Sequence, residues 1–172
     1  MKKSNAKIIA FSGILSALAI VLSIFESFLP AVPYMPPGAK LGLSNIVTMF
    51  AAAEIGLPAA LTIAVVKSLF VLVTRGFSAF CMSISGGVLS TIVMWLFFKY
   101  LRNIFGYWGI GIFSAMAHNM GQVVAASILL GSTTLYKSIP VLMIFSVATG
   151  LLTGTVLKLL MPAINKFTKR LE

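Results

Sequence analysis

Acidic residues are almost absent from this chain. Its 172 residues include no aspartate and three glutamates, Glu26, Glu54 and Glu172. Metal-assisted, acid–base and nucleophilic carboxylate chemistry all require acids at the reacting centre, often in clusters. Neither Glu26 nor Glu54 has an acidic neighbour in the sequence. The composition therefore argues against an enzyme, and we expect no catalytic residue and no metal site.

Cysteine and nucleotide-binding motifs are also scarce. The lone Cys81 excludes an internal disulfide and any cysteine-rich zinc or iron–sulfur site. The sequence contains no G-x-x-x-x-G-K-[ST] loop, the motif that cradles nucleotide phosphates. We expect no cofactor, and any ATP hydrolysis linked to this chain must occur on a partner.

Charge is too sparse for a soluble domain of this length. Hydrophobic side chains make up 59% of the residues and charged ones 9%, with a mean hydropathy of +1.06. A soluble surface cannot be covered with so few polar groups. The formal net charge of +10 is interpreted as basic loops facing anionic lipid headgroups, and not as a nucleic-acid surface. The composition places the chain in a lipid bilayer.

Long apolar stretches, separated by proline, glycine and basic residues, predict an all-α membrane protein with six transmembrane helices. Four prolines between residues 30 and 38 predict a non-helical outer loop. Gly86 and Gly87 mark an expected weak point, Tyr107 and Trp108 resemble interfacial anchors, and Pro162 is expected to close the last helix. The predicted helices span residues 8–25, 41–55, 58–74, 77–98, 109–130 and 139–160.

The distribution of lysine and arginine predicts the orientation of these spans. With the N-terminus in the cytoplasm, nine basic residues fall on the cytoplasmic side, three fall outside and Lys67 lies within a span. This bias would reverse if one of the first three helices were miscounted. We expect one transmembrane domain over residues 1–172, with both termini cytoplasmic, in a cell membrane.

Polar side chains within the predicted spans concentrate in the outer half of the bilayer. A charge placed in hydrocarbon costs about 2.5–3.5 kcal/mol on insertion scales, so such residues are candidate functional groups. The pattern predicts a pocket open to the outside, and the excess of cations predicts an anionic or acceptor-rich ligand. The candidate substrate-binding residues are Lys40, Asn45, Lys67, Arg75, Ser83, His118, Asn119, Gln122 and Lys137.

Each candidate also has a structural interpretation. Lys40, Arg75 and Lys137 can extend to outer headgroups, whereas Lys67, about ten residues into its helix, is poorly placed to do so. The polar residues of the fifth helix can serve as interhelical hydrogen bonds. Glu26 can be the counter-ion of Lys67 or Arg75.

Small residues define a second feature. Ala6, Ala10, Gly13 and Ala17 recur at spacings of four, three and four, which places them on one face of the first helix. Such a face lets another backbone approach closely. Residues 146, 150 and 154 repeat the arrangement on the last helix, where packing within the bundle is an equal explanation.

Three segments together resemble the substrate-binding S components of energy-coupling factor (ECF) transporters. They are the first helix from Gly13 to Leu22, the segment Lys40-Leu-Gly-Leu-Ser-Asn45 with the preceding proline-rich loop, and Glu54-Ile-Gly-Leu-Pro-Ala-Ala-Leu. The chain is most similar to the branch labelled heptaprenyl diphosphate synthase component I, or Gx transporter family. The resemblance implies that the face formed by Ala10, Gly13 and Ala17 docks on a membrane scaffold subunit, with two cytosolic ATPases supplying energy.

The synthase label conflicts with the composition. Prenyl diphosphate synthases hold diphosphate through magnesium bound by aspartate clusters, and this chain has no aspartate. The interpretation is therefore a membrane subunit that captures a small vitamin-like or cofactor-precursor solute from outside, with residues 30–38 as part of a lid. Two alternatives stay open: a stand-alone secondary transporter or channel, and an accessory membrane subunit of a prenyl-transfer, quinone-related or redox system.

Overall fold

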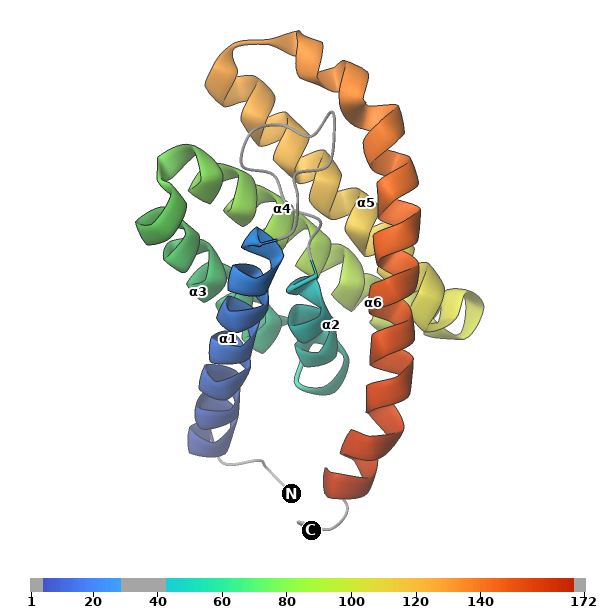
Figure 1. Cartoon of the computed structure of the whole chain (residues 1–172). Helices are drawn as coiled ribbons and strands as arrows, with labels where there is room; N and C mark the ends of the chain where they lie inside the picture. The colour runs from blue at the N-terminus through green and yellow to red at the C-terminus, as the bar shows by residue number, and fades with distance from the viewer. Residues whose placement is uncertain (1–4, 29–42, 169–172) are drawn as a thin grey trace.

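The structure, a computed structural model, describes residues 5–28 and 43–168. The described residues form helices joined by short connections and contain no strand (Figure 1). Lys40 and the predicted lid at residues 30–38 lie outside the described residues. In chain order, the helices are α1 (Asn5–Ser27), α2 (Asn45–Glu54), α3 (Leu57–Arg75), α4 (Phe77–Leu96), the π-helix η1 (Phe97–Leu101), α5 (Arg102–Leu130), the 3₁₀-helix η2 (Thr133–Ser138) and α6 (Ile139–Thr168).

Four helical stretches of the described residues are long and apolar enough to cross a membrane, by length and composition: Ile8–Ser27, Leu57–Arg75, Phe77–Leu130 and Thr133–Pro162. The third contains α4 and α5, which fold back on each other as a hairpin (Figure 1). Helix α2 has ten residues, about 15 Å of helix, which is half of a hydrocarbon core. The structure thus confirms an all-helical membrane protein, whereas six separate spans stay a prediction.

The turn between α4 and α5 differs from the expected loop. The chain continues from α4 through the π-helix η1 directly into α5, whose bounds begin at Arg102. A break inside α5 separates its first turn from the helix that follows residue 106, close to the predicted start near residue 109. The reversal occurs at Gly106, whose φ of 57° and ψ of −168° are not helical. Glycine alone adopts this conformation at little cost. Tyr107 and Trp108 therefore lie in the first turns of α5.

Helix α6 is also longer than expected. It runs through Pro162 to Thr168 and does not end near residue 160. Proline removes one backbone hydrogen bond and crowds the preceding turn. Pro162 is exposed, and prolines are tolerated in membrane helices where other groups satisfy the freed backbone carbonyl.

Burial in this bundle follows the pattern of a membrane protein. Large apolar side chains lie on the outside, such as Phe28 and Val73, whereas polar groups such as Ser68, Ser90 and Asn119 are buried. An apolar core that includes Ile63 and Met94 fills the other interior positions. Because lipid is the surrounding solvent, apolar residues need no burial and polar ones must find partners inside.

Small residues bring α5 and α6 into backbone contact. A Cβ atom added at Gly111 would clash with the carbonyl oxygen of Gly150, and one at Gly154 would lie 2.6 Å from that of Tyr107. Gly86 serves a similar purpose in α4, whereas a Cβ at Gly87 would make an ordinary contact with Ala64. Helix α4 is continuous at both residues and shows no break. The small residues of α6 thus pack within the bundle, one of the two interpretations that the sequence left open.

Candidate functional site

A buried polar stripe runs along α1, and its C-terminal members Ser23 and Glu26 line one side of a chamber. Ser12, Ser16, Ser23 and Glu26 are buried and repeat at spacings of four, seven and three, with Ala19 between them on the same face. The Oε1 atom of Glu26 accepts a hydrogen bond of 3.2 Å from the backbone N–H of Leu43, which ties the end of α1 to the start of α2. The serines were not predicted, although their spacing in the sequence carries this signal.

Lys67 projects from the middle of α3 into the bundle. Its side chain is 3% exposed. The Nζ atom donates hydrogen bonds of 2.8 Å to Oδ1 of Asn45 and 3.2 Å to Oγ of Ser44, at the beginning of α2. Because the side chain points into the bundle and not along its surface, snorkelling does not explain this lysine. The cation is instead held inside the protein by α2.

His118 and Gln122 contribute from α5, one turn apart. The Nε2 atoms of the two side chains are 2.8 Å apart, and an amide nitrogen in this bond is the donor, so the imidazole Nε2 accepts. Gly86 of α4 allows the close approach of α5, because a Cβ at that position would lie 2.7 Å from the His118 carbonyl oxygen. The glycine therefore fixes where this pair meets α4.

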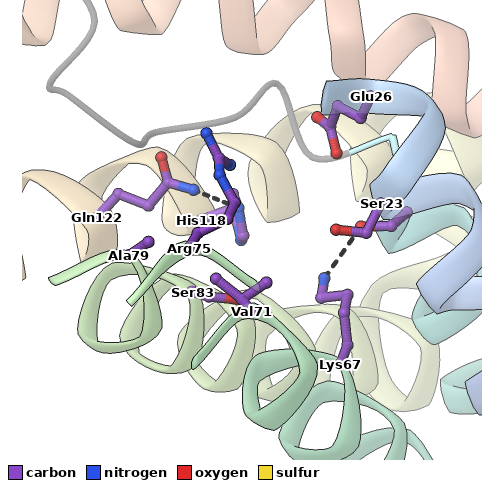
Figure 2. Close-up of a pocket in the computed structure, with 10 residues that line it drawn as sticks. Ser23, Glu26, Lys67, Val71, Arg75, Ala79, Ser83, His118 and Gln122 are labelled. Carbon is purple, nitrogen blue, oxygen red and sulfur yellow. Dashed lines mark hydrogen bonds between the residues drawn. The ribbon is translucent and has the colours of Figure 1, made fainter. Parts of the chain in front are cut away.

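The side chains converge on one chamber among α1, α2, α3, α4 and α5 (Figure 2). Figure 2 shows Lys67 on one side of this space and the bonded pair of His118 and Gln122 on the other. The chamber has a volume of about 20 Å³, which is room for about one or two water molecules. The lining residues are Ser23, Glu26, Ser44, Lys67, Val71, Arg75, Ala79, Ser83, His118 and Gln122.

The position of the chamber follows from the order of the helices. Its residues come from the C-terminal end of α1, the N-cap of α2, the C-terminal half of α3, the N-terminal part of α4 and the middle of α5. The start of α1 and the end of α6 lie at the opposite end of the bundle (Figure 1). Two cations, Lys67 and Arg75, and one carboxylate, Glu26, line the chamber. It is therefore polar, with a cationic excess.

Five predicted residues line the chamber, namely Lys67, Arg75, Ser83, His118 and Gln122. A sixth, Asn45, accepts a hydrogen bond from Lys67. Ser83 also shares a 3.0 Å hydrogen bond with Ser68. Arg75, at the end of α3, is exposed as well as lining the chamber.

Asn119 and Lys137 are not among the lining residues, contrary to their predicted placement. Asn119 follows His118 on α5, so its side chain projects about 100° further round the helix. Its Nδ2 atom donates a 2.8 Å hydrogen bond to Oγ of Ser146 on α6. Lys137 is exposed on η2. Asn119 thus serves the α5–α6 contact, the structural alternative considered for it.

The small-residue face of α1 points away from the bundle. Ala6, Ala10, Gly13 and Ala17 are exposed, and a Cβ added at Gly13 would meet no atom within 4 Å. The opposite face carries the buried polar stripe. Packing against the described parts of the chain therefore does not explain the spacing of these residues, in contrast to α6.

Comparison with known proteins gives two similarities. A family model described as heptaprenyl diphosphate synthase component I matches residues 15–160. A solved structure of the S component of a bacterial ECF transporter superposes with a TM-score of 0.63 at 21% sequence identity, covering 96% of this chain and 99% of that chain. At this identity the likeness establishes a shared fold. No curated protein sequence matches the chain.

Proposed function

The chain belongs to the heptaprenyl diphosphate synthase component I family, and from this premise and its fold we propose that it is the substrate-binding subunit of an ECF-type uptake transporter. The fold supports a membrane-embedded subunit of this kind. Its substrate in this proposal is a small anionic or acceptor-rich solute, of the vitamin or cofactor-precursor class.

The observation that carries the proposal is the buried position of Lys67 on a polar chamber. A lysine that is 3% exposed within a membrane helix is costly to insert, and structural packing alone does not require it. Lys67 and Arg75 supply positive charge, while Ser83, His118 and Gln122 supply hydrogen-bonding groups. Such a set suits a carboxylate or phosphate with further acceptor atoms.

The present chamber is narrower than a binding pocket for such a solute. Small-molecule pockets usually enclose about 300–1,000 Å³. The chamber encloses only about 20 Å³. Binding must therefore widen the chamber. The link from Glu26 to Leu43 and the bonds from Lys67 to α2 are the contacts that such a movement would change.

Orientation and coupling complete the proposal. With six crossings and both termini in the cytoplasm of a bacterial cell, the chamber opens to the outside, where a nutrient arrives. The exposed face formed by Ala10, Gly13 and Ala17 then docks on a transmembrane scaffold subunit, and two cytosolic ATPases drive transport. The small side chains of this face support docking, because small residues allow two helices to approach closely in lipid.

We do not propose synthase activity, despite the family name. Glu26 is hydrogen-bonded just before the start of α2, and Glu54 ends that helix. Ten residues of helix separate them by about 15 Å, so the two carboxylates cannot share a metal ion. The carboxylate clusters that bind magnesium diphosphate therefore have no counterpart among the described residues.

Native mass spectrometry of the purified protein tests solute capture. We expect a co-purified small molecule that is lost from the Lys67→Met variant and retained by the Lys137→Met variant, whose lysine is exposed on η2. Uptake into proteoliposomes should also require the scaffold and ATPases. Saturable uptake by this chain alone would support the secondary-transporter alternative instead, and no bound solute under any condition would contradict solute capture.

A further inference from the structure

A second group of charges lies where α4 turns into α5, at the end of the bundle away from the chamber. Three cations there each lie over an aromatic ring. Nζ of Lys99 is 4.7 Å from the ring centre of Trp95, and Nζ of Lys158 is 4.3 Å from that of Trp108. The guanidinium of Arg102 is 5.2 Å from the Tyr107 ring and donates a 2.6 Å hydrogen bond to its hydroxyl.

The packing of α5 on α6 builds this group. Gly154 lets the backbone of residues 107 and 108 approach α6. Thr155 then accepts a 3.1 Å hydrogen bond from the indole N–H of Trp108, and Lys158, one turn beyond Gly154, places its ammonium over the same indole. The Trp108 ring therefore contacts both Thr155 and Lys158 of α6. These contacts place Lys158 close to the first turns of α5.

These cations have no acidic residue on their own helices. The sequence contains no aspartate or glutamate from residue 55 to residue 171, a stretch that includes all of α3, α4, α5 and α6. Glu26 lies in the chamber, and Glu54 belongs to α2. Among the described residues, α3, α4, α5 and α6 therefore supply no carboxylate to these three cations, and a ligand that carries negative charge would complement them.

The surroundings indicate which partner supplies that charge. Ile104 and Leu159 are 72% and 71% exposed, and Tyr100 is 65% exposed. Exposed aliphatic side chains beside tryptophan, tyrosine and basic residues are typical of the membrane–water interface. We propose that Lys99, Arg102 and Lys158 bind the phosphate of an anionic phospholipid, whose acyl chains cover the adjacent apolar side chains.

This site is independent of the solute chamber, and its test needs no transported substrate. Clusters of basic residues at the membrane boundary attract anionic headgroups by about fivefold in affinity per cation near the surface. An acidic protein partner would satisfy the charge but would leave the apolar surroundings unexplained. A phospholipid satisfies both, which is why the proposal commits to it.

Tryptophan fluorescence can report directly on the site. The sequence has two tryptophans, Trp95 and Trp108, and the ammonium of one of the lysines lies over the ring of each. The chain is reconstituted in phosphatidylcholine vesicles that contain increasing fractions of dibrominated phosphatidylglycerol or dibrominated phosphatidylcholine. Bromine quenches tryptophan fluorescence on contact. A Trp95→Phe variant isolates the signal of Trp108.

We expect phosphatidylglycerol to quench Trp108 at a mole fraction about fivefold or more below that of phosphatidylcholine. The Arg102→Gln and Lys158→Gln variants should each reduce this preference by about fivefold, while Lys158→Arg should retain it. Lys137→Gln, which removes an exposed cation at the other end of α5, should leave it unchanged. Raising ionic strength to about 0.5 M should weaken the preference by screening.

Equal quenching by the two brominated lipids in the unaltered chain would overturn the proposal. A preference that survives both glutamine substitutions would overturn it as well, since it would then reflect only the general surface charge of the vesicle. Thermal unfolding of each variant in detergent confirms that the comparison is made between folded proteins.

Discussion

The Nζ atom of Lys67 donates a 2.8 Å hydrogen bond to Oδ1 of Asn45 and thereby links the middle of α3 to the first residue of α2. Asn45 is itself buried. A cation is thus fixed at a defined point of the chamber by a neutral amide. In the proposed function, the ammonium of Lys67 contributes attraction for an anionic solute at this point of the chamber.

Replacing Lys67 by methionine should weaken solute binding without preventing membrane insertion. A hydrogen bond to a charged group contributes about 1.5–3 kcal/mol, so we expect the Kd to rise by at least about tenfold. Isothermal titration with the co-purified solute measures this change. The matched Lys137→Met variant removes an exposed lysine and should bind normally. An unchanged Kd for Lys67→Met would remove this residue from the site.

Substituting Gly86 by alanine should disturb the chamber through α5. The new Cβ would lie 2.7 Å from the His118 carbonyl oxygen and 3.0 Å from Cγ of Gln122, so α4 and α5 must separate. Overpacking of this kind costs about 1–3 kcal/mol. We expect a lower Tm in detergent and weaker solute binding.

Gly87→Ala is the control for this effect, since its Cβ would lie 3.7 Å from that of Ala64, an ordinary contact. Both substitutions change helix propensity equally. If the two variants had the same Tm and affinity, the close approach of α4 and α5 at Gly86 would have no energetic role.

Asn119 and Gln122 should respond differently to replacement by leucine. Asn119→Leu removes the hydrogen bond to Ser146 on α6 and should lower stability by about 1 kcal/mol, with solute affinity retained. Gln122→Leu removes a polar group of the chamber and should reduce affinity. Measuring Tm and Kd for both variants separates the two roles. A loss of affinity in a stable Asn119→Leu protein would place that residue in the binding site.

The outer face of α1 should be required for assembly and not for binding. In the double variant Gly13→Leu with Ala17→Leu, two large side chains project from an exposed surface and block close contact with another helix. We expect loss of co-purification with the scaffold subunit and an unchanged Kd for the solute.

Ala148→Leu provides a control for that variant, because Ala148 is an exposed alanine on α6. It should assemble normally. Equal loss of assembly and solute binding in the α1 double variant would argue against a separate docking face.

Several features followed from the sequence alone. The lack of acids and the high hydropathy determined the membrane class, because neither depends on how the chain folds. The ends of α3 at Leu57 and Arg75 agree closely with prediction. Gly56, Pro58 and Gly76 set these ends through their own backbone conformations, which do not depend on distant contacts. Lys67 was identified because a charge far inside an apolar run is costly in any fold.

Other features were decided only by the tertiary structure. The sequence placed His118, Asn119 and Gln122 on one turn, but only the packing of α4 and α6 around α5 directs Gln122 to the chamber and Asn119 to Ser146. It likewise could not assign small residues to inner or outer faces: those of α6 are buried against α5, and those of α1 are exposed. Spacing defines a helical face, but which neighbour that face meets depends on contacts between segments far apart in the chain.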